Sequence, residues 1–309
     1  MKIIYKKDDF SFPKKTVVAL GNFDGLHIAH KRLIKEAVDL AKEKSIYSLA
    51  YIFDKHPMSV LQAQGPKLII RFQDKLRLLS QLGLDFTYIE EFNKEYAQTE
   101  PEDFVEKYLK NKLNAKVVIT GFDYRFGNKG KGDINTLKSL CSQYDIEVIA
   151  IEKICMGDLT ISSTLIRKYL QEGEVKKANQ LLGRPYFVTG LVEHGDRQGI
   201  VLGYPTANIY MNEELVIPKF GVYASNTHIG DKVYKSITSI GIKPTFESRI
   251  DNRVYFETHI LDKKNFDLYN QEITVELLDF IREEKKFENK EKLIEAIEKD
   301  ILLVNEIDE

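Results

Sequence analysis

The sequence predicts two domains of different classes, an α/β domain followed by an all-β domain. In the first half, β-branched runs such as TVVAL (16–20) and YSLAYIF (47–53) alternate with amphipathic stretches such as HKRLIKEAVDLAKEKS. Strands that alternate with helices pair in parallel through right-handed crossovers, which predicts a doubly wound α/β layer over residues 1–183. From about Tyr186, short strand-like runs follow one another without helices. This texture predicts an antiparallel barrel or sandwich over residues 184–309.

The remaining strands follow the same two textures. In the first half they are FTYIEEF, KVVITG and EVIAIE, and EDFVEKYLKNKL predicts a further helix. In the second half they are YFVTGLVEHG, PTANIYM, GVYASNTHIG, KVYKSITSIG, NRVYFETHIL and EITVELLDFI, with turn residues between them. These runs alone do not decide between a barrel and a sandwich.

The linking segment and the tail carry helical patterns. Residues 162–185 predict two short helices, broken at Gly173 and stopped by Gly183 and Pro185. The domain boundary is therefore expected at 183/184. The tail predicts a packed C-terminal helix, because apolar residues recur there at helical spacing, namely Leu293, Ile294, Ile297, Ile301 and Leu302.

Composition narrows the class of partner. The chain has 309 residues, enough for two domains, and its 45 Lys and Arg against 47 Asp and Glu give a net charge of −2. This balance predicts neither a nucleic-acid nor a membrane partner, so any anionic ligand must be held by local groups. Small-molecule substrates are expected. No obligate protein partner is implied, and the oligomeric state stays open.

The cellular context follows from the N-terminus and the cysteines. The first ten residues have no apolar core of signal-peptide length, and no window has the apolar run that spans a bilayer. Cys141 and Cys155 are too few and too isolated for a disulfide framework or a zinc site, so each is expected to serve as a small hydrophobe. A reducing, cytoplasmic location is expected.

The segment LGNFDGLHIAH (20–30) joins a predicted strand to a predicted helix that begins near Leu26. In open α/β sheets, ligands bind beyond the carboxyl ends of strands, where a helix N-terminus offers free N–H groups to a phosphate. His27 and His30 are three residues apart, so both rings can face one phosphoryl group, which would suit nucleotidyl transfer. The alternative is that one histidine caps the helix and the other is solvated.

In the second half, GIVLGYPTANIY (199–210) places two oxygen-bearing side chains two positions apart. On a strand, Thr206 and Asn208 share a face and can both address a magnesium ion or its phosphate ligands, although a polar edge strand fits equally. Alternation in NRVYFETHILD puts Glu257 on the face opposite Phe256. The carboxylate of Glu257 is then either a base facing a cavity or a solvated group.

The order of several motifs resembles a known family. G-x-F-D-G-x-H-x-x-H (21–30) resembles the nucleotidylyltransferase superfamily with its H-x-G-H motif. The segments GFDYRFGNKGKGD (121–133), ISSTLIR (161–167) and FDKHP (53–57) make the first half similar to the FAD synthetase module of prokaryotic bifunctional riboflavin kinase/FAD synthetases. The segments PTAN, PKFGVYAS, SIGIKPTF and FETHILD make the second half similar to their riboflavin kinase module, which is a small antiparallel barrel.

The resemblance implies roles for individual residues in the first half. The ATP site of the adenylyltransferase would comprise Gly21, Asp24, His27, His30, Ser162, Ser163, Thr164 and Arg167, with Arg167 neutralising the departing pyrophosphate. The flavin would meet His56, Pro57, Asp123, Phe126 and Gly127. Considered singly, Asp123 fits an Asx turn, Phe126 a core residue and the SST triplet a helix cap.

In the second half, the resemblance assigns Gly203, Thr206 and Asn208 to Mg-ATP, with Thr206 and Asn208 at the metal, and makes Glu257 the base on the ribityl hydroxyl. The loop HGDRQGIVLG, which carries Arg197, would be a phosphate-covering flap or simply a long hairpin turn. Asn270 replaces the Gly usual in the family, at a position where Asn also tolerates positive φ.

The implied function is the two-step synthesis of a flavin cofactor. With Mg²⁺ as cofactor and ATP as co-substrate, riboflavin becomes FMN, and FMN becomes FAD with release of pyrophosphate; the catalytic residues would be Glu257, His27, His30 and Arg167. Ala29 stands where the family usually has Gly, and Lys55 where it has Pro. The alternatives are a riboflavin kinase with a weak or inactive adenylyltransferase domain, and a non-catalytic flavin-binding regulator.

Overall fold

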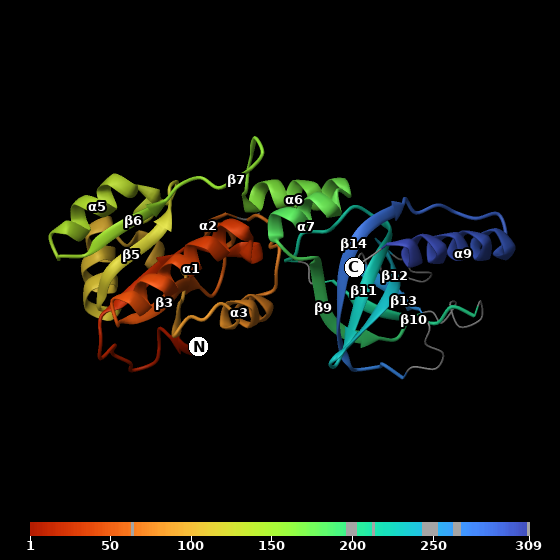
Figure 1. Cartoon of the computed structure of the whole chain (residues 1–309), viewed down its shortest axis with the longest axis horizontal. Coiled ribbons are helices and arrows are strands. Elements are labelled where there is room, and N and C mark those ends of the chain that lie inside the picture. Colours follow the sequence, from red (N-terminus) through yellow and green to blue (C-terminus); the bar gives the residue numbers. More distant parts are fainter. Residues whose placement is uncertain (63–64, 196–202, 212–213, 243–252, 262–266, 308–309) are drawn as a thin grey trace. The chain divides into compact units, whose positions relative to one another are not determined.

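The computed structural model describes residues 1–62, 65–195, 203–211, 214–242, 253–261 and 267–307. Its contacts divide the chain into two compact units, Met1–Ser162 and Ser163–Glu309. Each unit is described by itself (Figure 1). None of the described helices combines the length and the apolar character needed to cross a bilayer.

The first unit contains a six-stranded sheet whose neighbouring strands all run parallel. In spatial order the strands are β1 (Lys2–Tyr5), β4 (Phe86–Glu90), β3 (Tyr47–Phe53), β2 (Thr16–Leu20), β5 (Ala115–Gly121) and β6 (Glu147–Ile151). The helices are α1 (Ile28–Glu43), α2 (Pro57–Leu61), α3 (Phe72–Ser80), α4 (Pro101–Asp103), the π-helix η3 (Phe104–Lys112) and α5 (Ile134–Ser142), with short 3₁₀ turns η1 (Asp24–Leu26), η2 (Tyr96–Gln98) and η4 (Asn128–Gly130). The predicted parallel α/β layer is confirmed.

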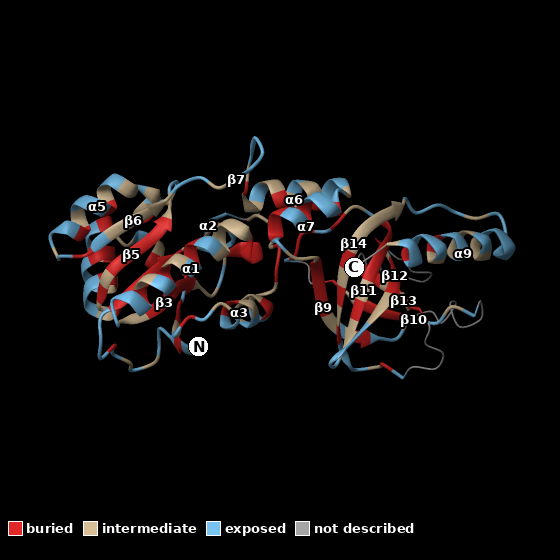
Figure 2. Cartoon of the chain, viewed as in Figure 1, coloured by how far each residue is buried: buried red, intermediate tan, exposed pale blue. Residues whose placement is uncertain are grey.

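The central strand β2 is buried on both faces, as the continuous apolar run TVVAL requires. Val18 and Leu20 pack into a core with residues of η3 and α5, whereas Val17 and Ala19 pack into a second core with residues of α1 and α3. The sheet is therefore covered on both faces, and Figure 2 shows the inner strand β5 as buried, whereas the edge strand β6 is largely intermediate.

The strand order reverses at β2, because the chain proceeds outward through β3 to β4 on one side and through β5 to β6 on the other. Ligands of open α/β sheets bind at such a switch point, beyond the carboxyl ends of the strands. The segments that follow β2, β3 and β5 all leave the sheet at this edge, so the fold brings together three of the segments singled out in the sequence.

The second unit is a closed antiparallel barrel, which answers the choice between barrel and sandwich. Around the barrel the strands are β10 (Thr206–Tyr210), β13 (Val254–Ile260), β12 (Lys232–Ile242), β11 (Gly221–Ile229), β14 (Glu272–Arg282) and β9 (Tyr186–Glu193). Its helices are α6 (Ser163–Glu172), α7 (Val175–Leu182) and the predicted C-terminal helix α9 (Lys290–Glu306).

The division between the units lies at Ser162/Ser163, twenty-one residues before the expected boundary at 183/184. The reason is that the linking helices pack on the barrel. The side chain of Asn179 donates to the Leu277 carbonyl at 2.8 Å and accepts from the Tyr186 N–H at 2.7 Å. Thus α7 is fixed to β14 and to the start of β9, and Gly183 ends it in a left-handed conformation as predicted.

Two sequence expectations are wrong in detail. Leu302 does not pack with the other apolar residues of α9, because its side chain is 64% exposed, while Val304 and Asp300 are buried. Cys141 is a buried hydrophobe, and burial raises the pKa of its thiol to about 12. Cys155 is exposed, because it lies in a small hairpin formed by β7 (Cys155–Met156) and β8 (Leu159–Thr160).

An ion pair fastens α9 to the barrel and generates a prediction of stability. The guanidinium of Arg282 donates to the Asp300 carboxylate at 2.8–3.1 Å, and the two side chains are 22% and 5% exposed. Removing one member of such a pair leaves a poorly solvated charge. We expect Asp300→Ala to lower the free energy of unfolding of the barrel unit by about 2–4 kcal/mol, measured by urea denaturation. Glu298→Ala, at an exposed position of the same helix, is the matched control and should change it by less than about 0.5 kcal/mol.

Candidate functional site

The turn between β2 and α1 is strained and buried. Phe23 and Leu26 hold positive φ angles of 50° and 43°, and Gly25 lies between them at 77°. Both apolar side chains are fully buried, so the surrounding core imposes this backbone path. Residues other than glycine reach such angles only at an energetic cost, and they gather where a site needs an exact geometry.

The two histidines follow this turn and lie together. Their rings stack with centroids 3.6 Å apart and an angle of 15° between the planes. His27 is also the N-cap of α1, because its Nδ1 accepts the His30 N–H at 3.3 Å. An Nδ1 that accepts leaves the proton of a neutral ring on Nε2. The prediction that both rings share one side is confirmed, and the capping alternative also holds for His27.

His30 is a half-buried base with unused hydrogen-bonding capacity. Its Nδ1 is buried and has no hydrogen-bond partner among the described residues. The edge-to-face contact with Phe23, at 5.3 Å between centroids, fixes its ring. Burial holds the pKa of His30 well below its usual value, and the neighbouring His27 and Lys75 lower it further. His30 is therefore uncharged at neutral pH.

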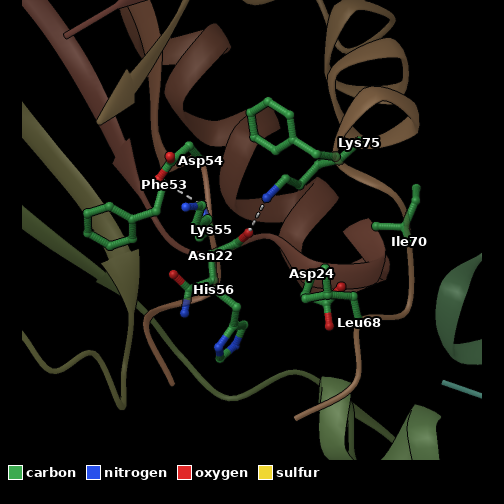
Figure 3. A pocket seen from close by; sticks show the side chains of 10 residues that line it. Asn22, Asp24, Phe53, Asp54, Lys55, His56, Leu68, Ile70 and Lys75 are labelled. Carbon is green, nitrogen blue, oxygen red and sulfur yellow. Dashed lines mark hydrogen bonds between the residues drawn. The ribbon is translucent and has the colours of Figure 1, made fainter. Parts of the chain in front are cut away.

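A small cavity lies beside this turn (Figure 3). The segments after β2 and β3, the loop before α3 and α3 itself supply its lining: Asn22, Asp24, Phe53, Asp54, Lys55, His56, Leu68, Ile70, Phe72 and Lys75. The walls combine apolar side chains with a few charged groups, which is typical of small-molecule sites.

Asp24 and Asp54 brace the loops of the cavity. The carboxylate of Asp24 is buried and accepts the Ile69 N–H at 3.0 Å, which ties the turn after β2 to the segment before α3. The carboxylate of Asp54 accepts the N–H groups of Lys55 and Phe92 at 2.8 and 2.9 Å. Each carboxylate therefore holds a loop end in place as well as lining the cavity.

His56 and Pro57 begin the short helix α2. His56 is its N-cap and accepts the Met58 N–H at 3.2 Å through Nδ1, while Pro57 occupies the first turn. The same tautomer argument leaves the proton of a neutral His56 ring on Nε2. His56 lines the cavity together with Lys55, so the predicted site residue His56 and the substituted position 55 face the same space.

The predicted flavin segment after β5 does not line this cavity in the described part of the chain. Phe126 is 6% exposed and packs in the core against Phe104, with ring centroids 5.3 Å apart, so the alternative of a core residue holds for its side chain. Asp123 is exposed. Gly127 has a φ of 74°, beside Pro101.

The ISSTLIR segment falls across the division between the units. Ser162 ends the first unit, whereas Ser163, Thr164 and Arg167 belong to α6 in the second. Thr164 is exposed and the other three are half-buried. Because each unit is described by itself, their roles at the ATP site remain predictions. Gly21 stands beside the Phe23 ring, where a Cβ would approach it to 2.8 Å.

In the barrel, the structure brings together the residues predicted for the second site. Asn208 on β10 is paired in register with Glu257 on β13, and the Thr206 hydroxyl donates to the Glu257 carboxylate at 2.8 Å. Asn208 is buried, and a Cβ on Gly195 would come within 2.4 Å of its amide nitrogen, so a larger residue at 195 would displace the Asn208 side chain. Glu257 is half-buried. Its exposure therefore lies between those of the two alternatives from the sequence, a base that faces a cavity and a solvated carboxylate.

The surroundings of this second site are partly described. Gly203 has a φ of 86°, with open space around its α-carbon. His259 contacts the Pro205 carbonyl at 2.9 Å through Nδ1. The predicted flap residue Arg197 lies outside the described residues, as does most of its loop. Asn270 has a φ of 61°, which confirms that this position uses the left-handed region.

Sequence reasoning missed several residues of the cavity, chiefly Asn22, Asp54 and Lys75. Asn22 and Asp54 lie inside the motifs GNFDG and FDKHP, but the sequence does not distinguish them from ordinary turn residues. Lys75 lies in the amphipathic stretch FQDKLRLLS, where a lysine resembles any solvated helical residue. Only the packing of α3 beside the turn reveals that it reaches the cavity.

Comparison with known proteins gives a consistent result for both halves. The family model described as FAD synthetase matches residues 9–165, and that described as riboflavin kinase matches residues 182–307. The chain is 38% identical to a bifunctional riboflavin kinase/FMN adenylyltransferase of Bacillus subtilis, covering 93% of this chain and 90% of that protein. It is 37% identical to the protein of the same name from Listeria monocytogenes, covering 97% and 96%.

One solved structure covers both chains completely. It is titled a macrolide-efflux protein from Streptococcus pneumoniae, is 31% identical and superposes with a TM-score of 0.90. The two proteins therefore share both the α/β unit and the barrel.

The half-buried His30 generates a prediction of pH dependence. Because its folded pKa lies well below its usual value, the imidazole should stay neutral as the pH falls through about 6.5. The unfolded chain binds a proton there and the folded chain does not, so His30 costs stability as the pH falls below about 6.5. We expect its imidazole nitrogen signals, assigned by their loss in His30→Gln, to show no titration between about pH 8 and 6. A midpoint at or above the usual value would contradict the neutral assignment.

Proposed function

The chain belongs to the bifunctional riboflavin kinase/FMN adenylyltransferase family, and we propose that the sites described above carry its two reactions. The chain phosphorylates riboflavin to FMN and adenylylates FMN to FAD, with ATP as the co-substrate of both steps. The first unit, matched by the FAD synthetase model, carries the adenylyl transfer, and the barrel carries the kinase. The boundary between the two activities lies between residues 162 and 183, the region of α6 and α7.

The observation that carries the first assignment is the stacked pair of His27 and His30 at the start of α1. In adenylyl transfer, a phosphate oxygen of FMN attacks the α-phosphorus of ATP while the bond from that phosphorus to the bridging oxygen of the β-phosphate breaks. Pyrophosphate leaves with the electron pair. The attacking phosphate needs no base, so the protein's task is to stabilise the charge that builds up on the α-phosphate.

The geometry suits that task. The free N–H groups at the start of α1 and the helix dipole favour an anion at this point. In our proposal, Nε2–H of His27 and the ring of His30 donate to phosphoryl oxygens, with Gly21 and Asp24 shaping the turn. Ser162, Ser163, Thr164 and Arg167 approach the triphosphate, and the charge of Arg167 stabilises the leaving pyrophosphate.

For the flavin we propose the end of the cavity that contains His56. His56 and Pro57 would face the flavin, and Asp123, Phe126 and Gly127 would supply the segment at the neighbouring strand. Because Phe126 is in the core, its side chain would anchor that segment to the core and would not stack on the flavin ring system.

In the barrel, the carrying observation is the hydrogen bond of Thr206 to Glu257. We propose that Glu257 accepts the proton of the ribityl 5′-hydroxyl as its oxygen attacks the γ-phosphorus of ATP. The bond to the oxygen that bridges the β- and γ-phosphates breaks, and ADP leaves. Thr206 holds the carboxylate in place until substrate binds.

The same residues fit a magnesium ion. Thr206 and Asn208 present a hydroxyl and an amide oxygen beside a carboxylate, and Mg²⁺ prefers oxygen ligands and usually keeps several waters and phosphate oxygens. The described residues contain no group of three or more His, Cys, Asp or Glu side chains placed around a metal. Thr206, Asn208 and Gly203 would therefore hold Mg-ATP mainly through its phosphates, and the ion would neutralise phosphate charge.

The wider setting belongs to the same proposal. All substrates are small molecules, and the net charge of −2 provides no general attraction for nucleic acid or anionic lipid. Cys141 and Cys155 are free thiols, which suits a reducing cytoplasm. We infer a cytoplasmic enzyme without nucleic-acid or membrane partners.

The first functional prediction tests the kinase reaction separately from the adenylyl transfer. Glu257→Gln keeps the size and the hydrogen bond to Thr206 but removes the base, so FMN formation from riboflavin and Mg-ATP should fall by at least about 100-fold. FAD formation from added FMN should stay within about twofold. Chromatography of the flavins measures both. A Glu257→Gln enzyme that still makes FMN at the native rate would exclude Glu257 as the base.

The second functional prediction is the reciprocal one. His30→Ala removes a donor at the α-phosphate, so FAD formation from FMN should fall about 100- to 1,000-fold while FMN formation is retained. Ala29→Gly, on the same helical turn, serves as the neighbouring control and should retain FAD formation. Equal loss of both activities in His30→Ala would point to misfolding or coupling and contradict the assignment.

A further inference from the structure

Lys75 is a charged residue of the cavity that none of the motifs contains. It lies on α3, and Figure 3 shows its side chain crossing to the turn after β2. Its Nζ donates to the Asn22 carbonyl at 3.2 Å, and its ammonium lies 5.2 Å from the centre of the Phe72 ring. An ammonium has three N–H donors, and in the described part of the chain Lys75 uses only one of them in a hydrogen bond.

No carboxylate of the described residues forms an ion pair with Lys75. Two other lysines of the same unit differ in this respect. Lys35 pairs with Asp39 on the surface of α1, and Lys6 pairs with Glu90. The two carboxylates nearest the cavity, Asp24 and Asp54, are already bonded to backbone N–H groups. Lys75 is therefore a half-buried cation with free donors that face a cavity.

The charges around Lys75 define its protonation. The titratable groups near it are the carboxylates of Asp24 and Asp54, the imidazoles of His30 and His56, and the Lys55 ammonium. Burial lowers the pKa of Lys75 to about 8, and the two carboxylates oppose the shift. At neutral pH, Lys75 is thus mostly charged, whereas His30 is neutral.

A second observation points to a ligand. His30 Nδ1 is buried and has no partner among the described residues, and Lys75 is close enough to lower the pKa of its ring. An unpaired polar atom at such a place is costly unless a ligand or water satisfies it. A phosphoryl group between His30 and Lys75 would accept from both.

We propose that Lys75 is a catalytic residue of the adenylyl transfer, whose ammonium binds the phosphate chain of ATP and stabilises the charge that develops as pyrophosphate leaves. This inference rests on the proposed function of the first unit. The two histidines supply directional donors, of which His30 is neutral, and Lys75 supplies the positive charge. The bond to Asn22 holds the ammonium in place, so α3 and the strained turn act together at the phosphate. The lysine transfers no proton in the step.

The test compares Lys75→Met, which keeps the length of the side chain, with Lys75→Arg, which keeps the charge. Lys42→Met, at an exposed lysine of α1, is the matched control. With the full chain, FMN and Mg-ATP, Lys75→Met should lower kcat/KM for FAD formation by at least about 100-fold. Thermal unfolding and FMN formation should equal those of the native chain. Retention of FAD formation within threefold would overturn the proposal.

The pH profile separates a charge at the phosphate from a mere brace for the turn. The ammonium is the active form and exists below its pKa, so kcat/KM of the native enzyme should fall as the pH rises through about 8. In Lys75→Arg, the fall in kcat/KM should occur only above about pH 10, because a guanidinium stays protonated. If Lys75→Met unfolds, this profile decides alone. An Arg variant that folds but is inactive, or whose kcat/KM still falls near pH 8, would overturn the proposal.

The outcomes also separate this inference from the function beneath it. If the native chain forms no FAD from FMN, the assignment of the first unit fails whatever the variants do. If the native chain forms FAD and Lys75→Met does so equally well, only the role of Lys75 fails.

Discussion

The strained turn between β2 and α1 is the constraint on which the first site depends. The positive φ angles of Phe23 and Leu26 would not persist on an exposed loop, because each costs free energy at a residue other than glycine. Here the core on the α1 and α3 side of the sheet buries both Phe23 and Leu26 and over-determines the backbone. The cost of the strain is met by apolar burial, and the result is a helix N-terminus aimed at the switch point of the sheet.

The charges of His30 and Lys75 are the second feature on which the first site depends. Burial disfavours a charge on His30, so the histidine pair does not provide the cation that a phosphate chain needs. Lysine is the residue that keeps most of its charge at the same depth, because its unperturbed pKa lies about four units higher. A neutral His30 beside a charged Lys75 therefore follows from the burial of the two groups. A shallower site would protonate the histidines, and a deeper one would neutralise the lysine.

The sequence predicted the architecture better than the detail of the site. The parallel and antiparallel classes and the closing glycine of α7 follow from local periodicity and turn chemistry. Periodicity does not place Thr206, Asn208 and Glu257 in one site; the family resemblance implies it, and the strand register brings the three residues together. The place of Lys75 does not, because it depends on where α3 packs after a loop that the Asp24 carboxylate fixes. Likewise, Phe126 has the same position in its sequence motif whether its ring contacts a ligand or packs in the core. Only tertiary packing distinguishes these cases.

The two reactions place opposite electrostatic demands on the protein, which explains why the two sites use different kinds of residue. Adenylyl transfer begins with an anionic nucleophile that needs no base, so its site needs donors and a cation around the α-phosphate. Phosphorylation of a hydroxyl begins with a neutral nucleophile, so its site needs a carboxylate, and the phosphate charge must be neutralised by a metal. A carboxylate placed freely at the first site would repel both phosphates. In the first unit, Asp24 and Asp54 are accordingly bonded to backbone N–H groups, whereas Glu257 in the barrel accepts, among the described residues, from a hydroxyl that substrate can replace.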